Sequence, residues 1–172
     1  MRNDIELAFD YFMRVPQPPP LPVGTQLRGQ GPTRLASRFS QPASVDEIKH
    51  AWPDGQLPSE LTLAWRRSRE SWLFEDTNYG QWGLHLLAPQ DCAAITRREL
   101  VGRPEDYRSD EIVIAEFLGD SDLLVMSPNA TGGAKILIAL PLYFREDWPV
   151  AASSLSEFLN LYREAEGMMF WE

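Results

Sequence analysis

The chain has 172 residues, of which 44% are hydrophobic and 24% charged, and its formal net charge at pH 7 is −9. This length forms one domain of ordinary size, and the single cysteine, Cys92, excludes an internal disulfide and a multi-cysteine zinc site. The acidic balance argues against a nucleic-acid partner, and no apolar run approaches the roughly 20 residues that cross a bilayer. The N-terminus also lacks the pattern of a signal peptide, so we expect a cytoplasmic protein that binds neither nucleic acid nor membrane.

The first 43 residues differ in composition from the rest of the chain. Ile5, Phe9 and Phe12 stand at helical spacing and predict a short helix over residues 3–13, which Pro16 ends. Seven of the fourteen prolines lie in residues 16–42, which predicts an extended strap laid over the domain, with a PxxP-type ligand as the alternative. We therefore divide the chain into residues 1–43, a helix and a Pro-rich strap, and residues 44–172, an α+β domain.

Two helices are expected after the strap. Ser44, with Glu47 three residues later, forms a capping box that begins a short helix. Pro58 stands at the start of a second helix, which is predicted to continue to about residue 71. The predicted inner face of this second helix consists of Leu61, Trp65, Ser68 and Trp72.

The centre of the chain is a predicted hairpin over residues 112–126, in which two apolar runs flank the turn sequence Gly-Asp-Ser-Asp. A strand over residues 82–88 and a short helix over residues 89–98 precede it, and a third strand over residues 135–140 follows it. A second capping box, Ser154 with Glu157, begins the last helix, and residues 168–172 are expected to tuck against the body. Helices followed by hairpin-linked strands predict an α+β fold, with an antiparallel meander sheet of about three or four strands packed with helices.

Acidic residues are concentrated in residues 105–122, where seven carboxylates accompany a single arginine, Arg108, for a net charge of −6. One interpretation is that this acidic segment forms a solvated face and two charged turns and has no binding role. The other is a docking surface for a basic protein partner, with Trp82 as an exposed aromatic anchor. Under the second interpretation, the candidate partner-binding residues are Glu75, Asp76, Glu105, Asp106, Asp110, Glu111, Glu116, Asp120, Asp122 and Trp82.

No pattern in the sequence points to catalysis. The two histidines, His50 and His85, are too few for a His-rich metal site, and residues 131–135 lack the Gly-Lys-Ser/Thr of a P-loop. Glu116 lies within an apolar strand, where it either pairs with an arginine such as Arg97 or Arg145 or faces a partner. We therefore predict no catalytic residue, no metal site and no cofactor.

The chain contains three segments that carry a family resemblance: SVDEIKHAWPDGQLPSELTLAWRRS, EIVIAEFLGDSDLLVMS and SSLSEFLNLY. They resemble the opening helices, the strand–turn–strand signature and the final helix of the SUKH superfamily, which includes the Smi/Knr-type fungal cell-wall regulators. Gly119, Asp120 and Asp122 occupy the recognisable turn positions. The chain departs from the family at residues 78–80, where Asn-Tyr-Gly replaces Asn-Gly or Gly-Gly, and residues 1–43 have no counterpart in the minimal domain.

The resemblance implies a mixed α+β fold used as a protein-binding module. Bacterial members look like immunity proteins that bind a cognate secreted toxin, often a nuclease or a deaminase, whereas fungal members act as regulatory scaffolds. A nuclease has a basic substrate groove, which suits the net charge of −11 over residues 44–172. We therefore expect an immunity protein that occludes its toxin. The alternatives are a scaffold without a toxin partner and an enzyme of unrecognised type.

Overall fold

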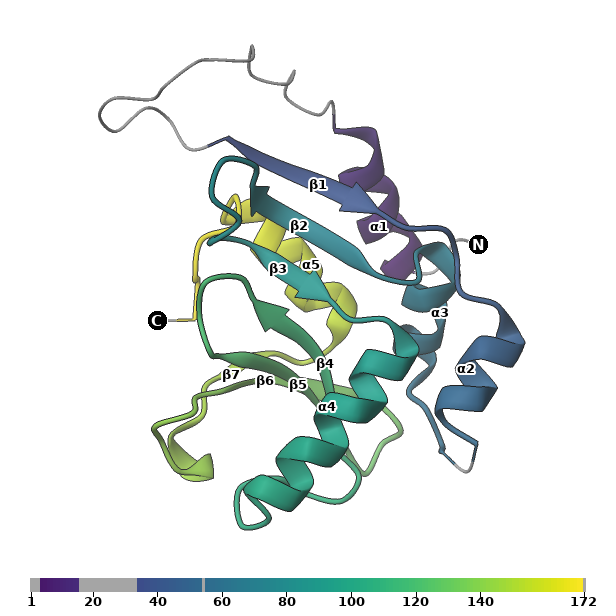
Figure 1. The fold of residues 1–172 in the computed structure, drawn as a ribbon, viewed down its shortest axis with the longest axis vertical. Coiled ribbons are helices and arrows are strands. Elements are labelled where there is room, and N and C mark those ends of the chain that lie inside the picture. Colours follow the sequence, from purple (N-terminus) through teal and green to yellow (C-terminus); the bar gives the residue numbers. More distant parts are fainter. Residues whose placement is uncertain (1–3, 16–33, 54, 172) are drawn as a thin grey trace.

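The computed structural model describes residues 4–15, 34–53 and 55–171, and within them seven strands form one antiparallel sheet (Figure 1). The strands are β1 (Leu35–Phe39), β2 (Ser71–Asp76), β3 (Leu84–Leu86), β4 (Ile112–Phe117), β5 (Leu123–Pro128), β6 (Ala134–Ala139) and β7 (Val150–Ala152). Each strand pairs with its neighbours in the sequence, so the sheet is a continuous meander. The prediction of an α+β fold with an antiparallel meander sheet packed with helices is confirmed.

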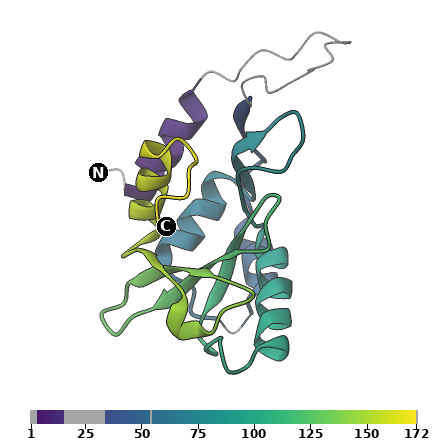
Figure 2. The same ribbon diagram turned by 90° about the vertical axis from the view of Figure 1, so that its left-hand side faces the viewer.

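Helices cover both faces of the sheet (Figure 2). They are α1 (Asp4–Arg14), α2 (Val45–Ala51), α3 (Ser59–Arg67), α4 (Pro89–Gly102) and α5 (Leu155–Glu164), with a short 3-10 helix, η1 (Arg145–Asp147), before β7. α1, α3 and α5 pack against one another on one face, whereas α4 packs against β4 on the other face, with α2 beside it. Ile5, Phe9 and Phe12 of α1 belong to the same hydrophobic core as the strands, so residues 4–14 are part of the body.

Both predicted capping boxes form hydrogen bonds at the start of a helix. The hydroxyl oxygen of Ser44 accepts the N–H of Glu47 at 3.1 Å, and that of Ser154 accepts the N–H of Glu157 at 3.1 Å. Each bond satisfies an N–H group that has no partner inside the helix. The carboxylate of Glu157 also accepts the N–H of Ser153 at 2.6 Å, and hydrogen bonds from the hydroxyl and N–H of Ser153 lower the pKa of Glu157.

The sheet is larger than the prediction of three or four strands. Residues 35–39 were predicted as part of the strap, but they form β1 and pair with β2, with Arg38 opposite Trp72. Residues 16–33 of the predicted strap lie outside the described residues. β2 extends through Glu75 and Asp76, and β7 was not predicted. β1 pairs with residues more than 30 positions away, and β7 has only three residues, so neither strand has a strong local signal.

Two helices end at other residues than predicted. α3 ends at Arg67 because Ser68 takes an extended conformation, with φ −154° and ψ 128°. The hydroxyl group of Ser68 accepts the N–H of Ser40 at 3.1 Å and donates to the carbonyl oxygen of Ser40 at 3.2 Å, so it holds the chain beside β1. Trp72 therefore belongs to β2, not to the inner face of α3 as predicted. α4 continues to Gly102, four residues beyond the predicted end.

The C-terminal tail packs against the body, as predicted. The ring centroid of Phe170 lies 5.6 Å from that of Phe158, and the centroid of Trp171 lies 5.1 Å from that of Phe117. The tail turns at Gly167, whose φ of 82° favours glycine. A Cβ atom at Gly167 would lie 2.7 Å from the Cβ of Phe74, so the close approach of the tail to β2 also requires glycine.

We expect Ser154→Ala to lower the free energy of unfolding by about 1 kcal/mol, because the N–H of Glu157 loses its acceptor. Ser154→Thr keeps a hydroxyl oxygen and is the matched control, which should retain most of the stability. Urea denaturation followed by circular dichroism measures both variants. Equal stability of the alanine variant and the wild type would show that the cap does not stabilise α5.

Candidate functional site

The loop between β6 and β7 exposes three consecutive apolar side chains. Leu142 is 93% exposed, Tyr143 56% and Phe144 71%, and we call these three residues the apolar tip. The loop projects from the body at the end opposite α1 (Figure 1). Single exposed apolar residues are common on protein surfaces, whereas a contiguous apolar group typically marks an interaction site.

Arg103 holds the backbone of the apolar tip in place. It follows the last residue of α4, and its guanidinium group donates hydrogen bonds to the carbonyl oxygens of Leu140 at 3.2 Å and Tyr143 at 2.7 Å. The same group donates to the carboxylate of Asp106 at 2.8 Å, and the indole N–H of Trp148 donates to the carbonyl oxygen of Tyr143 at 3.4 Å. The apolar tip is therefore presented on a fixed backbone, although it lies in a loop.

A buried ion pair anchors the other end of this loop. Glu111 is 2% exposed, and both of its carboxylate oxygens accept hydrogen bonds from the guanidinium group of Arg145, one of them at 2.8 Å. The backbone N–H of Arg145 donates to the carboxylate of Asp106 at 3.1 Å. A bidentate pair of this kind fixes both distance and orientation. Through it, residues 103–111 and the loop after β6 form one unit.

Four exposed carboxylates adjoin this unit. They belong to Glu105, Asp110, Glu146 and Asp147, and we call them the acidic rim. Each is next or next but one in sequence to Asp106, Glu111 or Arg145, which are in contact with one another. An apolar centre with a charged, solvated margin is the usual anatomy of a protein–protein interface. Of the predicted partner-binding residues, only Glu105 and Asp110 belong to the rim.

The other predicted partner-binding residues do not form one surface with the rim. Asp106 and Glu111 have the internal roles described above. Asp120 and Asp122 follow β4, whereas Glu105 and Asp110 precede it, and the six residues of β4 span about 20 Å. Near β1, Glu75 accepts a hydrogen bond from Arg38 at 2.6 Å, and buried Asp76 accepts the N–H of Asn78 at 2.9 Å.

Glu116 pairs with a histidine, not with Arg97 or Arg145 as predicted. A carboxylate oxygen of Glu116 lies 3.2 Å from Nδ1 of His85, which is its direct neighbour across β3 and β4. On the other side of the ring, Nε2 lies 3.2 Å from a carboxylate oxygen of Glu70. The ring of His85 also stacks on Trp72, with centroids 4.5 Å apart and an interplanar angle of 6°.

These side chains form one row across four strands. Arg38 lies over the ring of Trp72, with its guanidinium carbon 3.4 Å from the ring centroid. Arg38 faces Trp72, Trp72 faces His85 and His85 faces Glu116 in the strand pairing. We call Arg38, Trp72, His85 and Glu116 the cross-strand row. Sequence reasoning treated its members separately, because only the register of the strands brings them together.

The cross-strand row is poorly suited to chemistry. The two ring nitrogens of His85 point at different carboxylates, so His85 and these carboxylates do not converge on one metal ion. In the part of the chain that the structure describes, no group of three or more His, Cys, Asp or Glu residues could hold a metal. Cys92 is fully buried, and burial raises the pKa of its thiol well above the ordinary value, which makes it a poor nucleophile.

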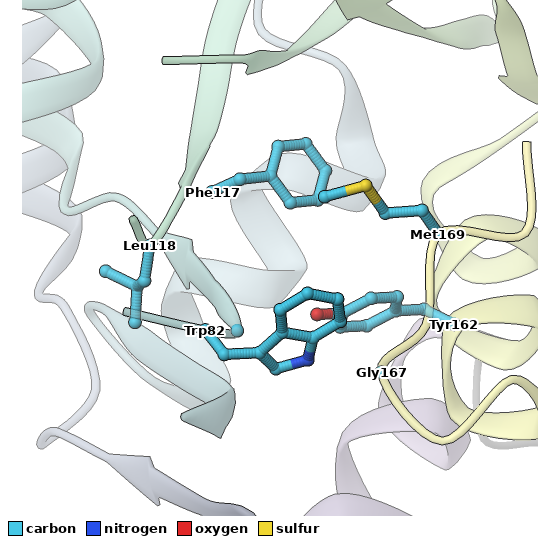
Figure 3. Close-up of a pocket in the computed structure, with 7 residues that line it drawn as sticks. Trp82, Phe117, Leu118, Tyr162, Gly167 and Met169 are labelled. Atoms are coloured by element: carbon cyan, nitrogen blue, oxygen red, sulfur yellow. The ribbon is translucent and has the colours of Figure 1, made fainter. Parts of the chain in front are cut away.

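Trp82, the predicted aromatic anchor, lines a small pocket beneath the C-terminal tail (Figure 3). The pocket also contains Phe117, Tyr162 and Met169, and the hydroxyl group of Tyr162 points toward Trp82 in this view. Burial raises the pKa of Tyr162, so its phenol stays protonated at neutral pH. Among the described residues that line the pocket, Tyr162 is the only ionisable one, so they supply no acid–base pair.

Comparisons with known proteins found no matching family model and no curated protein with a significant match. Among the described residues, no helix combines the length and the apolar character needed to cross a membrane.

Sequence reasoning missed the apolar tip, although the sequence carries a signal for it. Residues 142–144 are Leu-Tyr-Phe, between Pro141 and the charged residues 145–147, which is a loop composition. Three apolar residues in a row are unusual in such a segment. What the sequence does not contain is the pairing of Arg103 and Arg145 with groups some 34 to 40 residues away.

We expect Arg145→Met to lower the free energy of unfolding by about 3–5 kcal/mol, because it leaves the carboxylate of Glu111 buried without a counter-ion. The double variant Arg145→Met with Glu111→Leu should recover most of this loss. Arg98→Met, which removes an exposed pair with Glu99, is the control and should change stability by less than about 1 kcal/mol. A loss below about 1 kcal/mol for Arg145→Met, measured by urea denaturation, contradicts the anchoring role.

Proposed function

We propose that this chain is an immunity protein of the SUKH type, which binds a basic toxin domain and occludes its active surface. The apolar tip, fixed by Arg103 and bordered by the acidic rim, is the observation that carries the proposal. The toxin class that suits this surface is a nuclease or another enzyme with a basic substrate groove.

The energetics of the apolar tip favour a binding role. Exposed Leu142, Tyr143 and Phe144 contribute little to the stability of the free chain, whereas full burial of such side chains against a partner contributes roughly 2 kcal/mol each. Binding normally costs conformational entropy when a loop becomes ordered. Because the carbonyl oxygens of Leu140 and Tyr143 are already held by Arg103, this cost is reduced.

The acidic rim favours a basic partner. Glu105, Asp110, Glu146 and Asp147 are exposed, and the chain as a whole has a net charge of −9. Complementary charge mainly raises the association rate and excludes like-charged proteins, whereas the apolar contacts set the dissociation rate. A nucleic-acid-cleaving toxin needs a basic groove for its substrate, and an acidic protein that docks there blocks the substrate.

The resemblance to the SUKH superfamily supports the same function. The segments that carry it include α2 and α3, the β4–β5 hairpin and α5, and these elements belong to one α+β body. The decisive experiment measures binding of the full chain to the toxin domain encoded beside its gene, and then the activity of that toxin with and without the chain. A nanomolar complex with loss of toxin activity supports the proposal. Binding without loss of activity indicates a scaffold.

We expect Glu105→Lys with Asp110→Lys to slow association with the toxin domain several-fold at low salt, because the rim then repels a basic surface. The difference from the wild type should fade at 0.5 M NaCl, since salt screens exposed charges. Asp46→Lys with Glu164→Lys changes the net charge equally on α2 and α5 and is the matched control. Stopped-flow kinetics that slow equally in both double variants would show that the rim has no special role.

We expect Phe144→Ser to weaken the complex by about 2 kcal/mol, roughly a thirty-fold rise in Kd, mainly through faster dissociation. Tyr79→Ser is the control, because Tyr79 is also aromatic and is 69% exposed, but lies in the turn between β2 and β3. Surface plasmon resonance separates the two rate constants. Unchanged dissociation of the Phe144 variant would exclude the apolar tip from the interface.

A further inference from the structure

Both ring nitrogens of His85 face a carboxylate, and both can donate a hydrogen bond only if the ring carries two protons. Nδ1 lies 3.2 Å from a carboxylate oxygen of Glu116, and Nε2 lies 3.2 Å from a carboxylate oxygen of Glu70. An ionised carboxylate only accepts hydrogen bonds, and a neutral imidazole has one N–H and one bare nitrogen. Neutral His85 can therefore bond to one glutamate, while its other nitrogen faces a carboxylate lone pair. Only the imidazolium form donates to both.

We propose that His85 is held as an imidazolium and acts as a proton-operated clamp that joins β3 to β4 and to the segment before β2. The clamp is closed while the ring carries both protons. As the pH rises and the ring loses one proton, one of the two bonds is lost and one glutamate is released. This device is independent of the toxin-binding surface and uses residues to which the proposed function assigns no role.

The clamp lies on β3, which pairs with β2 on one side and β4 on the other and packs into the core through Leu84 and Leu86. β3 has three residues, and His85 is its central one. Trp72 of β2 stacks on the ring, so the side chain of His85 contacts both neighbouring strands as well as Glu70. When the clamp opens, the middle of the cross-strand row loses its connection to Glu70 or to Glu116. The expected consequence is weaker attachment of β3 within the sheet.

Charged groups from every neighbouring element act on the clamp. Glu116 comes from β4 and Glu70 from the segment before β2, and Arg69 lies 3.5 Å from the carboxylate of Glu70. Arg98 of α4 exerts a Coulombic attraction on Glu116. Arg38 of β1 lies on the far side of Trp72 and is paired with Glu75. Arg98 helps to keep Glu116 ionised, and an ionised carboxylate on each side of the ring requires a donor from each ring nitrogen.

The electrostatics of the site agree with this geometry. Burial by itself lowers the pKa of His85, but hydrogen bonds and Coulombic attraction from Glu116 and Glu70 outweigh it, and the pKa lies above its ordinary value of 6.5. The hydrogen bond from His85 is the main reason that the pKa of Glu116 is lowered. A raised histidine pKa means that the clamp stabilises the fold fully below about pH 6.5, the pKa in the unfolded chain. This stabilisation is lost as the pH rises through the higher pKa of the folded state.

Nuclear magnetic resonance of the full chain with ¹⁵N-labelled histidine tests the proposal directly. At pH 6.5 we expect both ring nitrogens of His85 to be protonated in most molecules, with a titration midpoint above 6.5. The chain has two histidines, and the signal of His50, which is exposed on α2, serves as the internal reference. Glu116→Gln and Glu70→Gln should each lower the midpoint of His85. A neutral ring at pH 6.5, or a midpoint that neither variant lowers, overturns the proposal.

The stability of the fold provides a second test. The difference in unfolding free energy between the wild type and His85→Gln should be largest near pH 6 and should shrink steadily toward pH 9, because glutamine carries no titrating proton. Urea denaturation across this range measures it, with Glu116→Gln as a second variant if His85→Gln does not fold. A difference that stays constant between pH 6 and 9 contradicts the clamp.

Discussion

The buried carboxylate of Glu111 constrains one end of this molecule. A charge with 2% exposure is stable only with a counter-ion, and Arg145 supplies it through two hydrogen bonds. Because Arg145 belongs to the loop after β6 and Glu111 precedes β4, satisfying this charge brings the two loops together. Arg103 then fixes the carbonyl oxygens of the loop, and the apolar tip remains outside. The exposed surface is thus a consequence of a buried electrostatic requirement.

Carboxylates that are paired inside the fold also explain why the number of acidic residues in a segment does not predict its surface charge. Within residues 105–122, the carboxylate of Asp106 is bound by Arg103, that of Glu111 by Arg145 and that of Glu116 by His85, so these three hold the fold together. The carboxylates left for a partner include Glu105 and Asp110, joined by Glu146 and Asp147 from a segment that is distant in sequence. The charge of residues 105–122 therefore overestimates how many of their carboxylates can reach a partner. It also omits Glu146 and Asp147, which are half of the acidic rim. Only the carboxylates that remain exposed attract a basic partner, so the total number of acidic residues in the sequence does not determine this attraction.

Local signals determined what could be predicted from the sequence. The hydroxyl groups of Ser44 and Ser154 each bond within three residues, and both helix starts were predicted correctly. The central hairpin was also predicted, since its apolar runs and its turn are adjacent. β1 was missed because its pairing partner β2 lies more than 30 residues away and its own neighbourhood is rich in proline. The pairing of Glu116 with His85 required the register of β3 against β4, which no local pattern contains.

The most direct test of the account is hydrogen–deuterium exchange of the full chain, free and bound to the proposed partner, a basic toxin domain. The account predicts that binding protects residues 140–147 and 104–110, which carry the apolar tip and the acidic rim. It also predicts little change in β1 and β2, at the other end of the sheet. Protection confined to residues 35–39 and 71–76, with none in the loop between β6 and β7, would contradict it.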